Sequence, residues 1–368
     1  MRIAQIAPLY ESVPPKTYGG TERVVSWLTE ELVAMGHDVT LFAAGDSQTQ
    51  AKLVEGSPTA LRAMAGYNDA TAHHYMLMEK LMQRSEQFDI IHAHLDYLPF
   101  PFVRANDLRS VTTMHGRLDF PILEQVFREY SEVPVVSISD NQREPLPGAN
   151  WKGTVYHGLP NDLYALNENP SDYVLFLGRV CADKGIVQAI EIAKRAGLRL
   201  KIAAKIDSND LAYYNEIKHL MDEEHVEYVG EASQDQKQEL IGNAKAMLFP
   251  IQWPEPFGLV MIEAMACGTP VIAFSCGSVP EVMDHGVTGF VCHNVDQAVE
   301  HLQNINQIDR RKCREVFEQR FNVSAMARGY VKVYEQILSE HRSLVPFGKL
   351  RKDVNIRRDE AELEVRQA

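Results

Sequence analysis

Glu255 and Glu263 stand eight positions apart in a segment whose other residues restrict the backbone. Pro256 prevents a helix from running through Glu255, and Gly258 permits the backbone to approach a ligand closely. We therefore expect a short helix that begins at about Gly258 and ends near Ala266. The free N–H groups at the start of such a helix form an anion site. An anion site beside carboxylates indicates a ligand that carries both phosphates and hydroxyls.

Two cations follow a predicted strand in the run F-L-G-R-V-C-A-D-K-G. Arg179 and Lys184 lie in the turn after this strand. Cations at the carboxyl end of a strand can neutralise a diphosphate, and an arginine can do so through two parallel hydrogen bonds. The two residues in isolation would also fit a solvated loop. Together with the anion site around Gly258, they predict a phosphate-binding cleft.

Glycines and a histidine follow predicted strands of the first half of the chain. Gly19 and Gly20 precede a predicted helix over residues 21–35, and such a pair allows tight backbone approach and leaves helix N–H groups free. A turn without a ligand is the alternative. His115 ends another strand, where side chains reach a cleft, and a satisfied loop histidine is its alternative.

Four other histidines come in two pairs. His92 and His94 alternate by two, so they share one face of a strand. That spacing could bind a metal, but no third ligand is evident, which favours a role in the core or in the lining of a cleft. His73 and His74 are adjacent on an expected helix, and we expect both at the surface.

Short β-like runs alternate with helical patterns over most of the chain, which predicts doubly wound parallel sheets with helices on both faces. The 368 residues suggest two such α/β domains in tandem. Their facing strand ends would make a deep cleft. The predicted strands are residues 3–7, 39–43, 89–93, 111–114, 135–137 and 154–156, then 173–177, 200–203, 228–229, 246–249, 271–274 and 289–291. The predicted helices include residues 184–196, 211–224 and 323–339.

Three regions follow from this pattern. Residues 1–160 form the predicted N-terminal domain, residues 161–322 the C-terminal domain, and residues 323–368 a helix and a charged tail. The segment 158–172 is rich in Asn, Asp and Pro and is the predicted linker. The helix could pack back on the N-terminal domain, and the tail from Val345 is either solvated or an oligomer contact.

Composition excludes several classes of protein. Hydrophobic residues make up 45% and charged residues 24%, so the chain as a whole is not disordered. The net charge of −13 argues against binding to nucleic acid. The chain has no stretch of 18 apolar residues, so we expect no integral membrane segment. Five cysteines without a C-x-x-C pair favour a reducing, cytoplasmic location and argue against a disulfide framework or a structural zinc site.

The segment around Glu255 and Glu263 resembles the E-x7-E element of glycosyltransferase family 4, the retaining enzymes with a GT-B fold. The turn with Arg179 and Lys184 is similar to the family's G-R-x(4–5)-K-G, and the Gly-Gly pair and T-T-M-H-G also match it. The resemblance implies transfer of a hexose from a nucleoside diphosphate sugar, with a UDP-sugar favoured, to an acceptor hydroxyl. No D-x-D triplet occurs, so no metal and no cofactor is expected.

The resemblance also implies roles for residues. Glu255 would contact the donor sugar hydroxyls, Glu263 the ribose, and Arg179 and Lys184 the phosphates, whereas His115 would lie close to the reacting sugar. The catalytic residues are then His115, Arg179, Lys184 and Glu255. The donor-binding residues are Gly19, Gly20, Arg179, Lys184, Glu255, Phe257, Gly258, Leu259, Val260 and Glu263.

Departures from the family pattern leave the base and the sugar open. Residues 157–162 read H-G-L-P-N-D instead of an N-G-V-D-like stretch, and Lys205 follows a strand where the family has a glycine-rich turn. Lys16 and Tyr18 could also reach the cleft, and the segment 137–142 either lines the cleft or supplies a helix N-cap at Ser139 or Asp140. A nucleotide-sugar epimerase, a phosphorylase, or a binding protein without turnover are the alternatives, and a homo-oligomer is possible.

Overall fold

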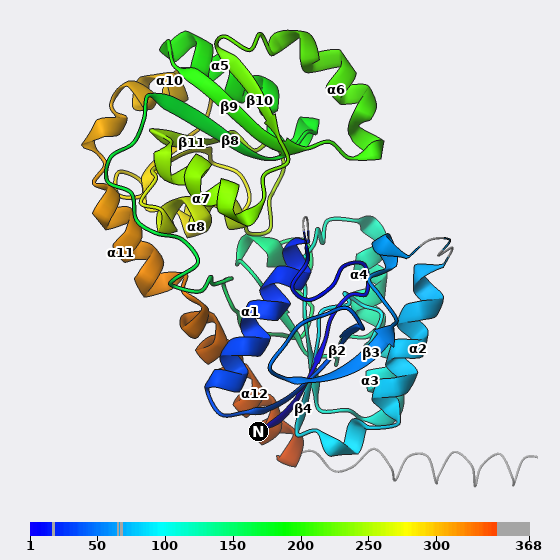
Figure 1. The fold of residues 1–368 in the computed structure, drawn as a ribbon. Coiled ribbons are helices and arrows are strands. Elements are labelled where there is room, and N and C mark those ends of the chain that lie inside the picture. Colours follow the sequence, from blue (N-terminus) through cyan, green and yellow to red (C-terminus); the bar gives the residue numbers. More distant parts are fainter. Residues whose placement is uncertain (17–18, 65, 67–68, 344–368) are drawn as a thin grey trace, which may run out of the picture.

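The computed structural model describes residues 1–16, 19–64, 66 and 69–343. Each of two lobes is built around a parallel sheet with helices on both faces (Figure 1). This confirms the predicted α/β architecture. Tyr18 and the tail from Val345 lie outside the described residues, so the predictions made for them are not addressed.

The first lobe contains a seven-stranded sheet in the order β3-β2-β1-β4-β5-β6-β7, in which every pair is parallel. The order reverses between β1 and β4, so the strand ends diverge there and open a crevice. The strands are β1 (Arg2–Ile6), β2 (Asp38–Ala44), β3 (Lys52–Ser57), β4 (Ile90–Ala93), β5 (Ser110–Thr113), β6 (Val135–Ser137) and β7 (Trp151–Thr154).

Both edges of this sheet differ from the sequence prediction. The edge strand β3 was not predicted, because K-L-V-E-G-S has a short apolar run and a glycine. The last strand was predicted at residues 154–156 and lies at Trp151–Thr154. Edge strands are exposed on one side and carry weaker apolar patterns, so their limits are hard to read.

The second lobe contains a six-stranded parallel sheet in the order β10-β9-β8-β11-β12-β13. Here the order reverses between β8 and β11, and each of these two strands leads into a predicted site segment. The strands are β8 (Tyr173–Arg179), β9 (Arg199–Lys205), β10 (Val226–Gly230), β11 (Ala246–Phe249), β12 (Val271–Phe274) and β13 (Gly289–Cys292).

The helices cover both faces of each sheet (Figure 1). The predicted helix over residues 211–224 is shorter, because α6 ends at Ile217 and a separate 3₁₀ turn follows. The helices are α1 (Gly20–Ala34), α2 (Ala70–Met82), α3 (Phe100–Asn106), α4 (Pro121–Glu129), α5 (Ile186–Ala196), α6 (Leu211–Ile217), α7 (Gln234–Asn243), α8 (Leu259–Ala266), α9 (Val279–Val282), α10 (Val295–Gln303), α11 (Arg310–Arg320) and α12 (Val323–Ser343).

The chain crosses between the lobes twice, and the two crossings touch. The N–H of Leu159 donates to Phe321 and the N–H of Val323 donates to Leu159. A Cβ on Gly158 would lie 2.3 Å from the Asn322 carbonyl oxygen, so only glycine permits this approach. Helix α12 then returns to the first lobe and lies against α1 (Figure 1).

The core of the first lobe therefore includes residues from the end of the described chain. Tyr330 and Tyr334 of α12 are fully buried among apolar side chains of β1, α1 and β4. The domain boundaries at residues 160 and 322 stay predictions. None of the helices in the described part of the chain is both long and apolar enough to span a membrane.

Candidate functional site

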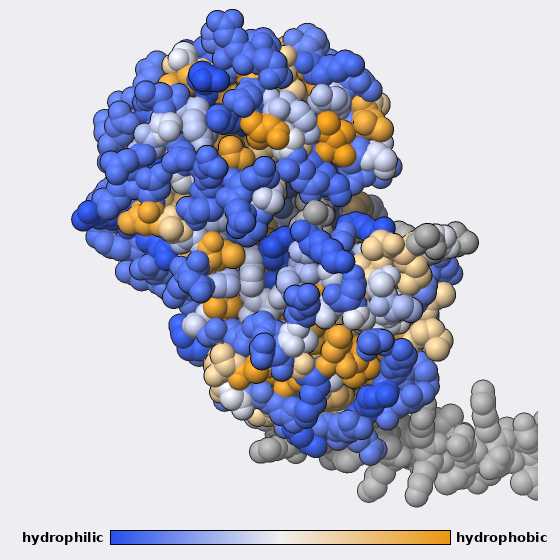
Figure 2. Space-filling model, viewed as in Figure 1, coloured by the Kyte–Doolittle hydropathy of each residue, from blue (hydrophilic) through white to orange (hydrophobic). Residues whose placement is uncertain are grey.

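A cavity of about 630 Å³ lies between the two lobes and is lined by both of them (Figure 2 shows the groove from one side). Residues from positions 8 to 263 reach it, because the reversal points of both sheets face each other. The lining includes every residue that the sequence analysis assigned to the site: Gly19, Gly20, His115, Arg179, Lys184, Glu255, Phe257, Gly258, Leu259, Val260 and Glu263. The geometry brings them together, and their roles stay predictions.

The anion site depends on the conformation of Gly258. This residue has φ of 77°, and a Cβ would lie 2.9 Å from the methyl of Met261. Helix α8 begins directly after it at Leu259, and no side chain of the described residues caps that helix. The first N–H groups of α8 therefore lie at the cavity with the positive end of the helix dipole, which suits an anion.

Lys184 is placed by a close approach of two loops. Gly185 has φ of 74°, and a Cβ on it would lie 1.9 Å from the Pro250 carbonyl oxygen. The N–H of Gln252 also donates to Asp183 at 2.8 Å. The turn after β8 is thereby held against the segment after β11, so Lys184 reaches Glu255 and forms an ion pair with it.

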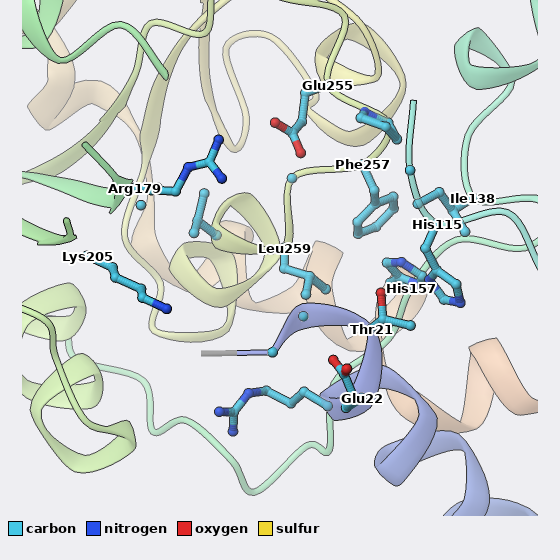
Figure 3. Close-up of a pocket in the computed structure, with 18 of the residues that line it drawn as sticks. Thr21, Glu22, His115, Ile138, His157, Arg179, Lys205, Glu255, Phe257 and Leu259 are labelled. Atoms are coloured by element: carbon cyan, nitrogen blue, oxygen red, sulfur yellow. The ribbon is translucent and has the colours of Figure 1, made fainter. Parts of the chain in front are cut away.

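Arg179 lies on the same side of the cavity as this pair. The side chains of Arg179 and Glu255 point toward the same space (Figure 3). Its Nε is 3.2 Å from Asp210, a carboxylate that the sequence analysis did not consider. The Arg179 side chain is 40% exposed and lines the cavity, so it is accessible to a ligand there. Lys205 lines the same end.

Glu263 is held rigidly inside α8. One oxygen, Oε1, accepts from the Tyr164 hydroxyl at 2.9 Å and from Lys237 Nζ at 3.1 Å. The other, Oε2, is buried, and no group of the described chain bonds to it. A buried carboxylate oxygen without a partner is costly, which suits a hydroxyl of a ligand. Sequence reasoning missed Tyr164 and Lys237, since neither lies in a motif.

His115 contacts the second lobe through the ring of His157. Its ring lies 5.3 Å from that of His157 at 18°, and His157 lies 4.9 Å from Phe257 (Figure 3). Burial lowers the pKa of His115 to about 3 and that of His157 well below its usual value, so both rings are neutral. His157 was noted only as a departure from the family pattern, and it proves to be a cavity residue.

The paired histidines divide between core and cavity. His92 is fully buried and His94 lines the cavity, as the core and cleft interpretation expected. Among the residues described here, no three or more His, Cys, Asp or Glu side chains are grouped so as to hold a metal.

The prediction for His74 was wrong. Its Nε2 accepts from the N–H of Leu9 at 3.0 Å, its Nδ1 donates to Ala70, and it is buried at the cavity. Adjacent residues on a helix point about 100° apart, so His73 lies nearer to solvent while His74 turns inward.

The glycine pair lies where the lobes approach each other. Gly19 precedes α1, and a Cβ on Gly20 would lie 3.9 Å from the Leu259 side chain. Lys16 points elsewhere and pairs with Asp46 at 3.4 Å, and it is absent from the cavity lining. In the segment 137–142, Ile138 lines the cavity, and Ser139 accepts from the N–H of Gln142 at 3.1 Å in the manner of an N-cap.

Two family models match the chain in succession. Residues 18–140 match Glycosyltransferase Family 4, and residues 165–320 match Glycosyl transferases group 1. The chain belongs to the family 4 glycosyltransferases. This confirms the predicted family. The Gly19-Gly20 pair lies in the first matched region and the E-x7-E segment in the second.

Two curated relatives of the glycosyltransferase cover most of its length, and a third covers a shorter part. Spore coat protein SA of Bacillus subtilis is 24% identical over 91% of this chain and 100% of its own. An uncharacterized 41.2 kDa protein in the cps region of Klebsiella pneumoniae is 29% identical over 86% of this chain and 96% of its own. N-acetyl-alpha-D-glucosaminyl L-malate synthase of Bacillus anthracis is 32% identical, over 34% of this chain and 35% of its own.

Solved structures confirm the GT-B fold. Sucrose-phosphate synthase from Thermosynechococcus elongatus superposes with a TM-score of 0.75 at 19% identity, over 92% of this chain and 100% of that one. AviGT4, a glycosyltransferase involved in avilamycin A biosynthesis, gives 0.72 at 21%, over 92% and 98%. HepE from Anabaena, in complex with UDP and glucose, gives 0.70 at 17%, over 91% and 100%.

Proposed function

We propose that this glycosyltransferase moves a hexose from a nucleoside diphosphate sugar, with a UDP-sugar as the favoured donor, to an acceptor hydroxyl with retention at the anomeric carbon. The observation that carries the proposal is the convergence of three groups on one cavity. Arg179 and Lys184, the start of α8 and the unpaired oxygen of Glu263 all line it. Cations and amides suit the diphosphate, and the carboxylate suits a ribose hydroxyl.

The positive groups in the cavity would stabilise the diphosphate as it leaves the sugar. Negative charge that develops on the leaving oxygen would lie between Lys184 and the first amides of α8. Glu255 pairs with Lys184, and a bound phosphate would compete for that ammonium group. Glu255 would then be released to accept hydrogen bonds from the sugar hydroxyls.

The two glutamates do not resemble the acid and nucleophile of a glycosidase. Glu263 is buried and already accepts two hydrogen bonds, so it cannot attack a sugar carbon. Glu255 lies on the side of the cations. The proposal is therefore attack by the acceptor on the face from which the diphosphate departs, with a diphosphate oxygen accepting the proton of the acceptor hydroxyl.

The lobes also suit a reaction from which water is excluded. HepE, a structural neighbour, is described with UDP and glucose bound, and the same fold here encloses a cavity between lobes. Closure around a donor would limit its hydrolysis. The N-terminal lobe would bind the acceptor and the C-terminal lobe the nucleotide sugar. A cytoplasmic location is part of the proposal.

Thermal stabilisation by UDP-, GDP- and ADP-sugars tests the donor, since a ligand that binds only the native state raises its apparent melting temperature. We expect stabilisation by one class, and a transfer product whose anomeric proton coupling shows the configuration of the donor. Lys184→Ala should abolish transfer, whereas Lys194→Ala, a half-exposed lysine of α5, should not. Full transfer by Lys184→Ala, or inversion in the product, would refute the proposal.

A further inference from the structure

A buried chain of hydrogen bonds leads from the C-terminal helix to His115. Tyr334 of α12 lies 3.1 Å from Nε2 of Gln5, whose Oε1 lies 2.8 Å from Nε2 of His94. Nδ1 of His94 in turn lies 2.8 Å from Nε2 of His115. Gln5, His94 and Tyr334 are at most 3% exposed, so water does not compete for these bonds.

Each bond in this chain fixes the proton of the next group. The Gln5 carbonyl oxygen only accepts, so His94 donates from Nε2. A neutral imidazole has one N–H, so Nδ1 of His94 accepts and Nε2 of His115 donates. Burial lowers the pKa of both histidines, which keeps each ring neutral. Nδ1 of His115 is then left with a lone pair.

The amide N–H group of Gln5 also has a hydrogen-bond partner. Its amide N–H group donates to the Tyr334 hydroxyl, and that hydroxyl lies 2.7 Å from Nδ1 of His92. Nε2 of His92 lies 2.7 Å from Thr113 Oγ1, which donates to Tyr330 at 3.1 Å. Because Thr113 donates to Tyr330, Nε2 of His92 donates to Thr113 and Nδ1 of His92 accepts from Tyr334. The Tyr334 oxygen then accepts from the Gln5 amide, whose Nε2 also lies 3.4 Å from Nδ1 of His92, so α12 fixes the orientation of that amide.

Nδ1 of His115 is the free end of this network. His115 lines the cavity, and Nδ1 makes no hydrogen bond to the described part of the chain. We propose that Gln5 and Tyr334 are positioning residues that hold His115 as the Nε2–H tautomer, so that its Nδ1 accepts a hydrogen bond from a hydroxyl of the bound substrate. That this hydroxyl belongs to a sugar or to the acceptor rests on the proposed function. The tautomer of His115 does not depend on that function.

The tautomer can be read directly from the ¹⁵N–¹H spectrum of histidine side chains. In the ¹⁵N-labelled protein we expect a protonated Nε2 and an unprotonated Nδ1 for His115, assigned from the signals lost in His115→Asn. Gln5→Met and Tyr334→Phe should each produce a mixture of tautomers at His115. Tyr130→Phe, the same chemical change outside the network, should leave the spectrum as it is. A protonated Nδ1 in the unmodified protein would overturn the proposal.

Kinetics separate this inference from the proposed function. With the best donor, kcat/KM should fall about tenfold in Gln5→Met, the cost of a misplaced hydrogen bond, and should not fall in Tyr130→Phe. A His115 signal that stays wholly in one tautomer in both variants, or unchanged kcat/KM beside a mixed tautomer, would contradict the positioning role. Absence of any transfer by the unmodified protein would overturn the proposed function and leave the tautomer assignment to stand on the spectrum.

Discussion

The ammonium group of Lys184 and a carboxylate oxygen of Glu255 are in direct contact within the cavity between the lobes. Their side chains are only 23% and 14% exposed, so water screens the pair weakly. The residue proposed for phosphate and the residue proposed for sugar hydroxyls thus neutralise each other. A bound phosphate would compete with Glu255 for Lys184.

Glu255→Gln should bind UDP several-fold more tightly and transfer sugar much more slowly. The substitution removes the charge that competes with phosphate for Lys184, and it also removes the proposed acceptor for sugar hydroxyls. Lys184→Ala should weaken UDP binding by roughly 10- to 100-fold, the size of a charge-assisted hydrogen bond. Titration calorimetry with UDP measures both. Weaker UDP binding by Glu255→Gln would show that the carboxylate does not compete.

Glu263→Gln should weaken the binding of UDP about tenfold and leave the binding of inorganic pyrophosphate nearly unchanged. The reason is that Oε2 of Glu263 has no partner in the described chain and is proposed to accept from the ribose. The isosteric change keeps the shape of the buried site beside Tyr164 and Lys237. Competition of each ligand with a fluorescent nucleotide measures the difference. Equal losses for both ligands would place Glu263 at the phosphates instead.

Gly185→Ala should lower the melting temperature more than Gly197→Ala does. The two glycines have φ of 74° and 68°. A left-handed alanine should therefore lower the free energy of unfolding by about 1–2 kcal/mol in both variants. Only at Gly185 does a Cβ meet the backbone, at 1.9 Å from the Pro250 oxygen, whereas nothing lies within 4 Å at Gly197. Overpacking should add about 1–3 kcal/mol there. Calorimetry of the two variants compares them, and equal shifts would contradict the close approach.

Sequence motifs identified the cavity lining because each motif follows a strand of a parallel sheet. The segments around Gly19, His115, Arg179 and Glu255 all come after strands, and strand ends of two facing sheets converge. The partners of these residues were not predicted. Tyr334 reaches Gln5 only because α12 returns to the first lobe, and a contact across 329 positions leaves no local pattern.

Two further residues, His74 and Asp210, were misjudged or missed. His74 shares the buried face of α2 with Leu77, Met78 and Leu81 at positions i+3, i+4 and i+7, a helical signal that the prediction did not use. Asp210 was missed as the partner of Arg179, because it follows β9 in sequence and meets β8 only through sheet pairing. Local sequence indicates which elements form, and tertiary contacts select the partners of charged groups.

Stability should fall as the pH decreases below about 6.5. His92, His94, His115 and His157 are held neutral by burial, so their pKa values are lowered in the folded state and the unfolded chain binds more protons. Their contribution is complete above pH 6.5 and is lost as the pH falls toward about 3, the pKa of His115. Each histidine adds up to about 1.4 kcal/mol per pH unit.

His92→Gln provides the comparison for this pH dependence. The variant should be less stable at pH 7.5, and its loss of stability between pH 6.5 and 5.5 should be smaller than in the unmodified protein by about 1 kcal/mol. Denaturant unfolding at three pH values measures both slopes. Raised pKa values of Glu22 and Asp96 act in the opposite sense in both proteins, so they cancel in the difference. Parallel slopes would mean that His92 is not neutral in the folded state.

Glu281 of α9 joins the second lobe to the first. Its two carboxylate oxygens accept from the N–H groups of Asp140 and Asn141, each at 2.7 Å, and Oε2 also accepts from the Tyr156 hydroxyl at 3.2 Å. Burial and the charge of Glu281 raise the pKa of Tyr156 to about 12, so this hydroxyl remains a donor. One carboxylate of the second lobe therefore holds three donors of the first lobe.

Glu281→Ala should loosen that contact and leave each lobe folded. We expect a larger radius of gyration in small-angle scattering without ligand, and a higher KM for the donor with kcat reduced less, because closure must then order the lobes. Glu315→Ala, which removes a half-exposed glutamate paired with Lys312, should change neither quantity. An unchanged radius of gyration together with an unchanged KM in Glu281→Ala would show that the crossings at Leu159 and Asn322 suffice to set the spacing.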